Sequence, residues 1–195
     1  MPDAKYYPNY WNDYCSLVKR TGGKPEPRWA VFAARYRVAG NFQRGDYFFM
    51  SARSTRAYDV ALKLLLCFSA LESACVASGT KPLNHVLGDF DGYAGVCRRL
   101  ARKHFGGLAE EEFPLRSALS NVTLKTRLSM FFSGSSDDLM PLAMSLRHLF
   151  AHGHWTPNGS NTLTAGACNC LDLLNLSLLD KCDEILTSHV ETLRA

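Results

Sequence analysis

Long apolar runs are missing from the start of this chain of 195 residues, which opens MPDAKYYPNYWNDY. A secretory signal needs an apolar core of roughly 7–15 residues. A membrane-spanning helix needs about 20 apolar residues, and we find no such segment. The cysteines number seven, an odd total, and Cys67 and Cys75 lie within apolar helical pattern. Because reduced thiols act there as small hydrophobes, we expect a soluble cytoplasmic protein with no membrane partner and no disulfide framework.

Convincing strand alternation, internal repeats and low-complexity tracts are also absent, whereas helical periodicity recurs throughout. The sequence therefore predicts an all-α fold, a compact bundle of about five to six helices. A chain of this length with 47% hydrophobic residues fits one domain, residues 1–195, with a basic N-terminal extension over about residues 1–50. Residues 47–51 are interpreted as a connection. The helical patterns cover approximately residues 9–20, 27–36, 55–78, 89–105, 112–132, 137–152 and 168–193.

The positive charge is small and unevenly placed. The formal net charge is +4, with ten Lys/Arg against five Asp/Glu in residues 1–60 and twelve against thirteen in residues 61–195. A second concentration of cations lies on the helical pattern of residues 89–105, and it predicts a basic face that is either solvated or bound to the backbone of RNA. Its proposed RNA-binding residues are Arg98, Arg99, Arg102 and Lys103, with His104 beside them.

Several catalytic motifs are absent. The sequence has no phosphate-binding glycine loop, no Ser/His/Asp arrangement and no nucleotidyltransferase pattern, so no cofactor is predicted. The apolar helix of residues 55–78, closed by Gly79, has the composition of a central bundle helix. It carries Glu72, for which we favour a polar groove or an arginine partner over a site role.

The helical pattern of residues 137–152 carries the candidate chemistry. The string SSDD supplies an N-cap, Pro141 is tolerated near the helix start, and Gly153 ends the helix. One apolar stripe faces the core, and Arg147, His148 and His152 share the opposite, non-core side. The expected stripe consists of Leu139, Leu142, Ala143, Leu146, Leu149 and Phe150.

The string SLRHLFAHGHW resembles the signature of the HEPN (higher eukaryote and prokaryote nucleotide-binding) superfamily: an Arg, a polar residue directly after it, and a His after four to six intervening residues. Arg147, His148 and His152 match these positions in turn. The resemblance implies a metal-independent endoribonuclease that uses the RNA 2′-hydroxyl as nucleophile and leaves a cyclic phosphate. It also implies a site composed by two copies of the motif across a homodimer axis, and a toxin or defence role with an inhibitor or regulatory partner.

The residue types suit that reaction. Arg147 offers a planar fork of donors for phosphate oxygens. The dipole at the helix C-terminus favours a protonated His152, which can then donate a proton. His148 would orient one of these groups or contact phosphate.

Two alternatives to catalysis remain open. A zinc site would use the pattern HxxxHxH…CxC, formed by His148, His152, His154, Cys168 and Cys170. The tight Cys-x-Cys spacing and the absence of HExxH disfavour this alternative. The second alternative keeps the HEPN-like fold without catalysis, as a module that binds RNA or nucleotide or takes part in assembly.

Overall fold

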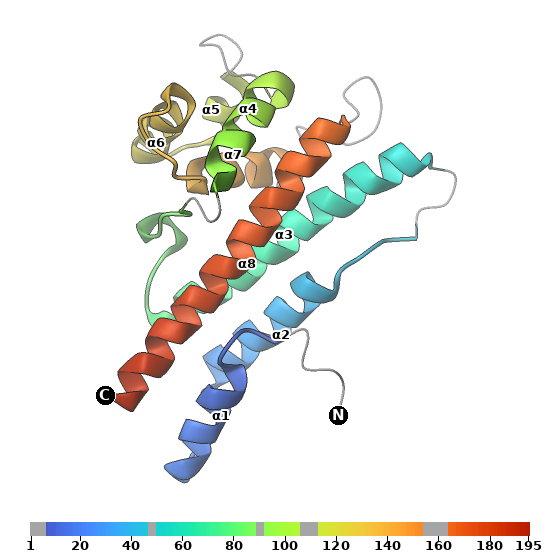
Figure 1. Cartoon of the computed structure of the whole chain (residues 1–195). Helices are drawn as coiled ribbons and strands as arrows, with labels where there is room; N and C mark the ends of the chain where they lie inside the picture. The colour runs from blue at the N-terminus through green and yellow to red at the C-terminus, as the bar shows by residue number, and fades with distance from the viewer. Residues whose placement is uncertain (1–6, 47–49, 89–91, 106–112, 154–163) are drawn as a thin grey trace. The chain divides into compact units, whose positions relative to one another are not determined.

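The computed structural model describes residues 7–46, 50–88, 92–105, 113–153 and 164–195 (Figure 1). These residues contain eight α-helices and no β-strand, which confirms the all-α prediction and exceeds the expected five to six helices. The elements are α1 (Trp11–Arg20), α2 (Pro27–Asn41), α3 (Ala52–Ser78), the 3-10 helix η2 (Pro82–Asn84), α4 (Tyr93–Phe105), α5 (Phe113–Ala118), α6 (Val122–Ser133), α7 (Met140–Ala151) and α8 (Ala165–Arg194). Part of the predicted connection, residues 47–49, lies outside the described residues.

The single helix predicted over residues 112–132 is wrong, because the chain forms two helices there, α5 and α6. The break ends at Asn121, whose side-chain oxygen accepts a hydrogen bond from the backbone N–H of Leu124 at 3.2 Å. Asn competes with the backbone for hydrogen bonds and therefore favours a helix start over a helix interior. The apolar periodicity continues across the break and hides it in the sequence.

The chain separates into two compact units, and α3 and α8 contribute one half to each. Unit 1 comprises residues 1–42, 66–84 and 178–195, and unit 2 comprises residues 43–65 and 85–177. The N-terminal region that the sequence predicted as a basic extension thus contributes two helices, α1 and α2, to unit 1 (Figure 1).

Unit 1 has an aromatic core. Trp29 of α2 is fully buried and stacks on His189 of α8, with ring centroids 4.6 Å apart, and Tyr14 of α1 packs against both rings. Asp183 of α8 accepts hydrogen bonds from the Asn9 backbone N–H at 2.7 Å and from the Tyr36 hydroxyl at 2.8 Å. These contacts attach the N-terminal helices to the C-terminal half of α8.

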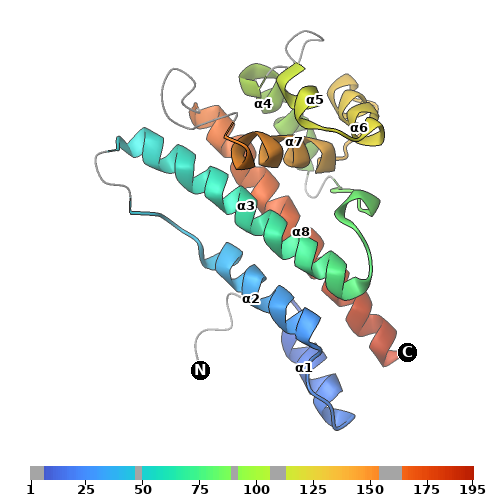
Figure 2. The same cartoon turned by 180° about the vertical axis from the view of Figure 1, so that it is seen from behind.

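In unit 2, α7 contacts both α5 and α6, and the three short helices lie together in both views (Figures 1 and 2). The first halves of α3 and α8 join through Asn175, whose side-chain amide donates to the Val60 carbonyl at 3.3 Å. Buried leucines fill the space between the helices, among them Leu64, Leu115, Leu128, Leu146 and Leu174. Helix α7, which carries Arg147 and His148 of the predicted motif, is therefore packed against α5 and α6.

From the sequence we expected no segment apolar enough to cross a membrane, and α3 corrects that expectation. By length and hydropathy α3 qualifies as a candidate span, but 56% of the qualifying window is buried within the protein. Buried positions such as Leu64, Leu71 and Cys75 are what the predicted central bundle helix requires. Gly79 follows the helix with a φ of 73°, as its expected role in helix termination requires.

Candidate functional site

The start of the motif helix α7 is fixed by a buried ion pair. Asp138 accepts hydrogen bonds from the backbone N–H groups of Met140 at 3.1 Å and Leu87 at 3.2 Å, and it pairs with Arg127 at 2.6 Å. The predicted start at Asp137 is therefore three residues early: the carboxylate of Asp138 binds the first turn, and the helix begins at Met140. Pro141 lies in the first turn, as expected.

The end of α7 agrees with the prediction. The helix ends at Ala151 with His152 as C-cap, and Gly153 adopts a left-handed φ of 67°. The backbone N–H of His152 donates to the His148 carbonyl at 3.1 Å, and that of Gly153 donates to the Phe150 carbonyl at 3.2 Å. Glycine is favoured at this position because it has no Cβ to clash in the left-handed region.

The two faces of α7 separate core from candidate site. The predicted apolar stripe is buried, except for Phe150, which is half-buried. Arg147 and His148 are half-buried and His152 is exposed, so all three lie outside the buried face. The imidazole rings of His148 and His152 stack almost in parallel, with centroids 5.7 Å apart and an interplanar angle of 3°. One helix end thus presents an arginine and two stacked imidazoles.

The zinc alternative gains no support from the described part of the site. His154 lies outside the described residues, and no cluster of three or more His, Cys, Asp or Glu side chains suited to a metal is found among those that are described. Cys168 and Cys170 are buried on α8, and the Cys170 thiol donates to the Cys97 carbonyl at 3.9 Å. The hydrogen bond with Cys97, followed by burial, raises the pKa of the Cys170 thiol well above its ordinary value.

Two of the four predicted RNA-binding cations make structural contacts with the end of α6. Arg98 donates to the carbonyls of Phe131 at 2.6 Å and Ser136 at 2.9 Å, and Arg102 donates to the carbonyl of Phe132. The last carbonyls of a helix have no partner within the helix, so these arginines act as C-terminal caps. An RNA contact for Arg98 and Arg102 remains a prediction. Both side chains already donate hydrogen bonds to backbone carbonyls of the protein. Arg99 and Lys103 are exposed.

His104 contacts the first turn of α8, which the sequence did not indicate. Its Nδ1 lies 2.8 Å from the hydroxyl of Thr164, and that hydroxyl also accepts the backbone N–H of Ala167 at 3.2 Å. A Cβ placed on Gly166 would lie 2.3 Å from His104 Nε2, so glycine permits this close approach. Burial, together with the charge of Lys103, lowers the pKa of His104.

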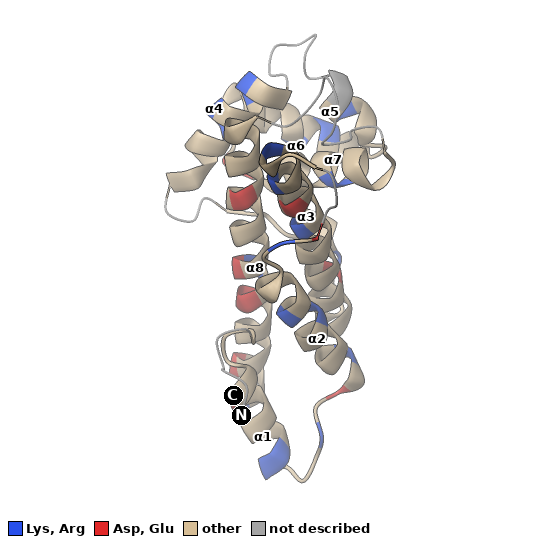
Figure 3. Ribbon diagram, turned by 90° about the vertical axis from the view of Figure 1, so that its right-hand side faces the viewer, with Lys and Arg blue, Asp and Glu red and all other residues tan. Residues whose placement is uncertain are grey.

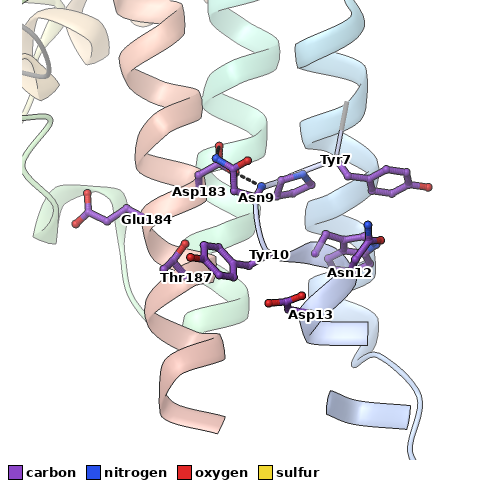
Figure 4. Close-up of a pocket in the computed structure, with 10 residues that line it drawn as sticks. Tyr7, Asn9, Tyr10, Asn12, Asp13, Asp183, Glu184 and Thr187 are labelled. Atoms are coloured by element: carbon purple, nitrogen blue, oxygen red, sulfur yellow. Dashed lines mark hydrogen bonds between the residues drawn. The ribbon is translucent and has the colours of Figure 1, made fainter. Parts of the chain in front are cut away.

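Unit 1 contains a pocket of about 500 Å³ between the N-terminal segment and α8 (Figure 4). Its carboxylates already have partners within the protein: Asp13 pairs with Arg194 at 2.5 Å, Glu184 pairs with Lys181, and Asp183 binds Asn9 and Tyr36. Asp13 and Glu184 are thus paired with cations, whereas the partners of Asp183 are neutral hydrogen-bond donors. Glu72, considered above as a paired or groove residue, is half-buried and lines a different cavity beside Arg28 and Arg35.

Comparisons with models of known families, with curated proteins and with solved structures found no match. The class that the fold establishes is an all-α helical protein. Any functional conclusion therefore rests on the chemistry of the residues themselves.

Proposed function

We propose that this chain is a cytoplasmic, metal-independent endoribonuclease of the HEPN type. The observation that carries the proposal is the end of α7, where Arg147 and the stacked pair His148 and His152 lie outside the buried face of a helix fixed at both ends. The helix holds these side chains on a rigid element, which catalysis requires. The proposed substrate is RNA, and no metal or other cofactor takes part.

Arg147 is proposed to bind the phosphate under attack. Its guanidinium is always charged and carries a planar fork of donors, which fits two non-bridging oxygens of a phosphate at once. As the 2′-oxygen adds to phosphorus, negative charge grows on those oxygens, and a fixed cation stabilises the transition state more than the ground state.

The two histidines are proposed to share the proton transfers. The two ring centroids lie 5.7 Å apart, and the reaction needs one imidazole that accepts a proton and one that donates a proton. The neutral ring takes the proton of the 2′-hydroxyl as that oxygen bonds to phosphorus. The protonated ring gives its proton to the departing 5′-oxygen. The products are a 2′,3′-cyclic phosphate and a 5′-hydroxyl, and no water or metal is consumed in this step.

A homodimer belongs to the same proposal. A two-fold axis places one surface patch against its own copy, and the resulting cleft would join two Arg147 side chains and four histidines. Such a concentration of positive charge attracts a polyanion. Light scattering should give a mass of twice the 21.7 kDa of one chain. A monomer at micromolar concentration would remove the composite cleft from the mechanism. In the cell, the proposed nuclease would act as a toxin or defence protein, and an inhibitory or regulatory protein would cover the cleft.

Single-turnover cleavage of a labelled RNA in excess EDTA tests the function. His152→Ala removes a proton donor or acceptor and should slow cleavage by about 10²-fold or more. Arg147→Lys keeps the charge and loses the fork, so it should also be strongly impaired. Arg20→Lys, an exposed change on α1, is the matched control and should cleave at the wild-type rate. Binding of RNA without cleavage by the wild-type protein would favour the non-catalytic alternative.

A further inference from the structure

The basic residues at the end of α4 lie against the start of α8 in unit 2. His104 joins the two helices through Thr164 at 2.8 Å. Lys103 is exposed and directly precedes His104 in the last turn of α4. Arg99 lies four residues before Lys103 and is also exposed, so the two share one face of α4.

Cations from the first turns of α3 lie beside the same segment of α8. Arg56 donates to the side-chain oxygen of Asn169 at 2.7 Å and lies 3.5 Å from Asp172. Burial raises the pKa of the Cys168 thiol, and the charges of Arg56 and Arg53 act in the opposite direction. Arg53 lies three residues before Arg56 on α3, so the two residues share the face of α3 from which Arg56 contacts α8. Arg53 and Arg56 are exposed to solvent.

The opening turns of α8 thus have cations on both sides, and we call Arg53, Arg56, Arg99 and Lys103 the α8 basic cluster. Figure 3 shows the Lys and Arg on α4, and the acidic residues that α8 carries along its length. Within its first turns α8 has one acidic residue, Asp172, against the four cations of the cluster. The positive end of the helix dipole adds to this potential, because α8 begins at Ala165.

We infer that the α8 basic cluster binds the phosphate backbone of single-stranded RNA and holds the strand that the α7 residues cleave. The inference rests on the proposed function for the identity of the polyanion. Exposed Arg and Lys side chains neutralise phosphates without reading bases, so the cluster contributes affinity rather than sequence preference. It extends the basic face predicted from the sequence: Arg53 and Arg56 join Arg99 and Lys103, while Arg98 and Arg102 already cap α6.

Binding of a fluorescein-labelled 20-nucleotide polyuridine tests the cluster. Anisotropy is measured between 50 and 200 mM salt in a His152→Ala background, so that the probe is not cut. The double variant Arg53→Gln/Lys103→Gln should bind about tenfold more weakly, from two exposed contacts of roughly 0.7 kcal/mol each. Its salt slope should fall by about 1.4, because each single-strand phosphate contact contributes about 0.7.

The matched control is Lys19→Gln/Arg20→Gln, which removes the same charge from exposed positions on α1 in unit 1. An equal loss of affinity in this control, or an unchanged slope in the cluster variant, would overturn the inference. Should the cluster variant lose helical circular dichroism, Arg99→Gln/Lys103→Gln carries the same test within α4.

Two further readouts separate this inference from the proposed function. If the wild-type protein leaves RNA intact but the cluster variant still loses RNA affinity, the nuclease proposal fails and the binding site stands. If cleavage follows the α7 residues while the cluster variant binds RNA normally, only the binding site fails. Sedimentation with vesicles containing about one third phosphatidylserine tests the other polyanion. Cluster-dependent binding to vesicles with unchanged RNA affinity would contradict the RNA assignment.

Discussion

Replacing Asp138 by alanine should destabilise the protein by about 3–5 kcal/mol, whereas the same replacement at the preceding residue, Asp137, should cost at most about 1 kcal/mol. The two side chains are chemically identical and adjacent in sequence. They differ in burial, since the side chain of Asp138 is 5% exposed and that of Asp137 is 58% exposed. Each of them pairs with an arginine, and Asp138 in addition accepts hydrogen bonds from two backbone N–H groups.

The larger cost at Asp138 comes from the groups that would lose their acceptor. Two backbone N–H groups, those of Leu87 and Met140, and the guanidinium of Arg127 all donate to this carboxylate. Without it, a largely buried cation loses its counter-charge and two backbone donors lose their acceptor, which is the costly way to break a buried ion pair. At Asp137 the lost contact to Arg98 is exposed, and water replaces it.

Urea unfolding followed by circular dichroism measures the difference. With a slope of about 2 kcal/mol per molar urea, the Asp138 variant should shift the midpoint down by about 1.5–2.5 M, and the Asp137 variant by less than about 0.5 M. Equal shifts for the two variants would refute the assignment of Asp138 as the residue that fixes the start of α7.

Three other outcomes are expected. Leu146→Ala, at a fully buried position of α7, should lower the free energy of unfolding by about 2–5 kcal/mol in the same assay. Leu176→Ala, at a half-exposed position of α8, should lower it by less than about 1 kcal/mol. A reversed order would contradict the packing. Burial lowers the pKa of both His104 and His189. As the pH falls towards the ordinary histidine pKa of about 6.5 and below it, the unfolded chain therefore binds protons more readily than the folded protein. The free energy of unfolding should decrease as the pH is lowered from about 7.5 to about 5.5. His189→Phe keeps an aromatic ring at that position and should make the decrease shallower; a steeper decrease would refute the sign. Arg98→Gln should lower the thermal midpoint through the lost α6 cap, and RNA affinity lost without any such change would assign Arg98 to RNA instead.

The elements that follow from local rules were predicted well from the sequence. Gly79 and Gly153 end α3 and α7, and both adopt the left-handed conformation that glycine favours. The buried stripe of α7 follows from apolar spacing alone, and only Phe150 is less buried than expected. The placement of Arg147, His148 and His152 off that stripe follows from the same spacing. These features depend on residues within a few turns of one another.

The features that were missed depend on contacts between distant segments. Arg98 caps a helix that ends more than thirty residues later, and Asp138 binds Arg127 and Leu87 from two other segments. The contact of His104 with Thr164 spans sixty residues. Hydrophobic periodicity does not indicate which distant residues form hydrogen bonds with each other. The basic face was therefore interpreted as one uniform surface, although Arg98 and Arg102 donate hydrogen bonds to the end of α6.

The most direct test of the central claim is mass spectrometry of the RNA ends that the purified protein generates in excess EDTA. We expect new 2′,3′-cyclic phosphate and 5′-hydroxyl ends from the wild-type protein. The same ends should be absent, or formed about 10²-fold more slowly, with a folded His152→Ala variant. Cleavage at the wild-type rate by that variant, or 3′-hydroxyl ends that disappear when metal is chelated, would contradict the account.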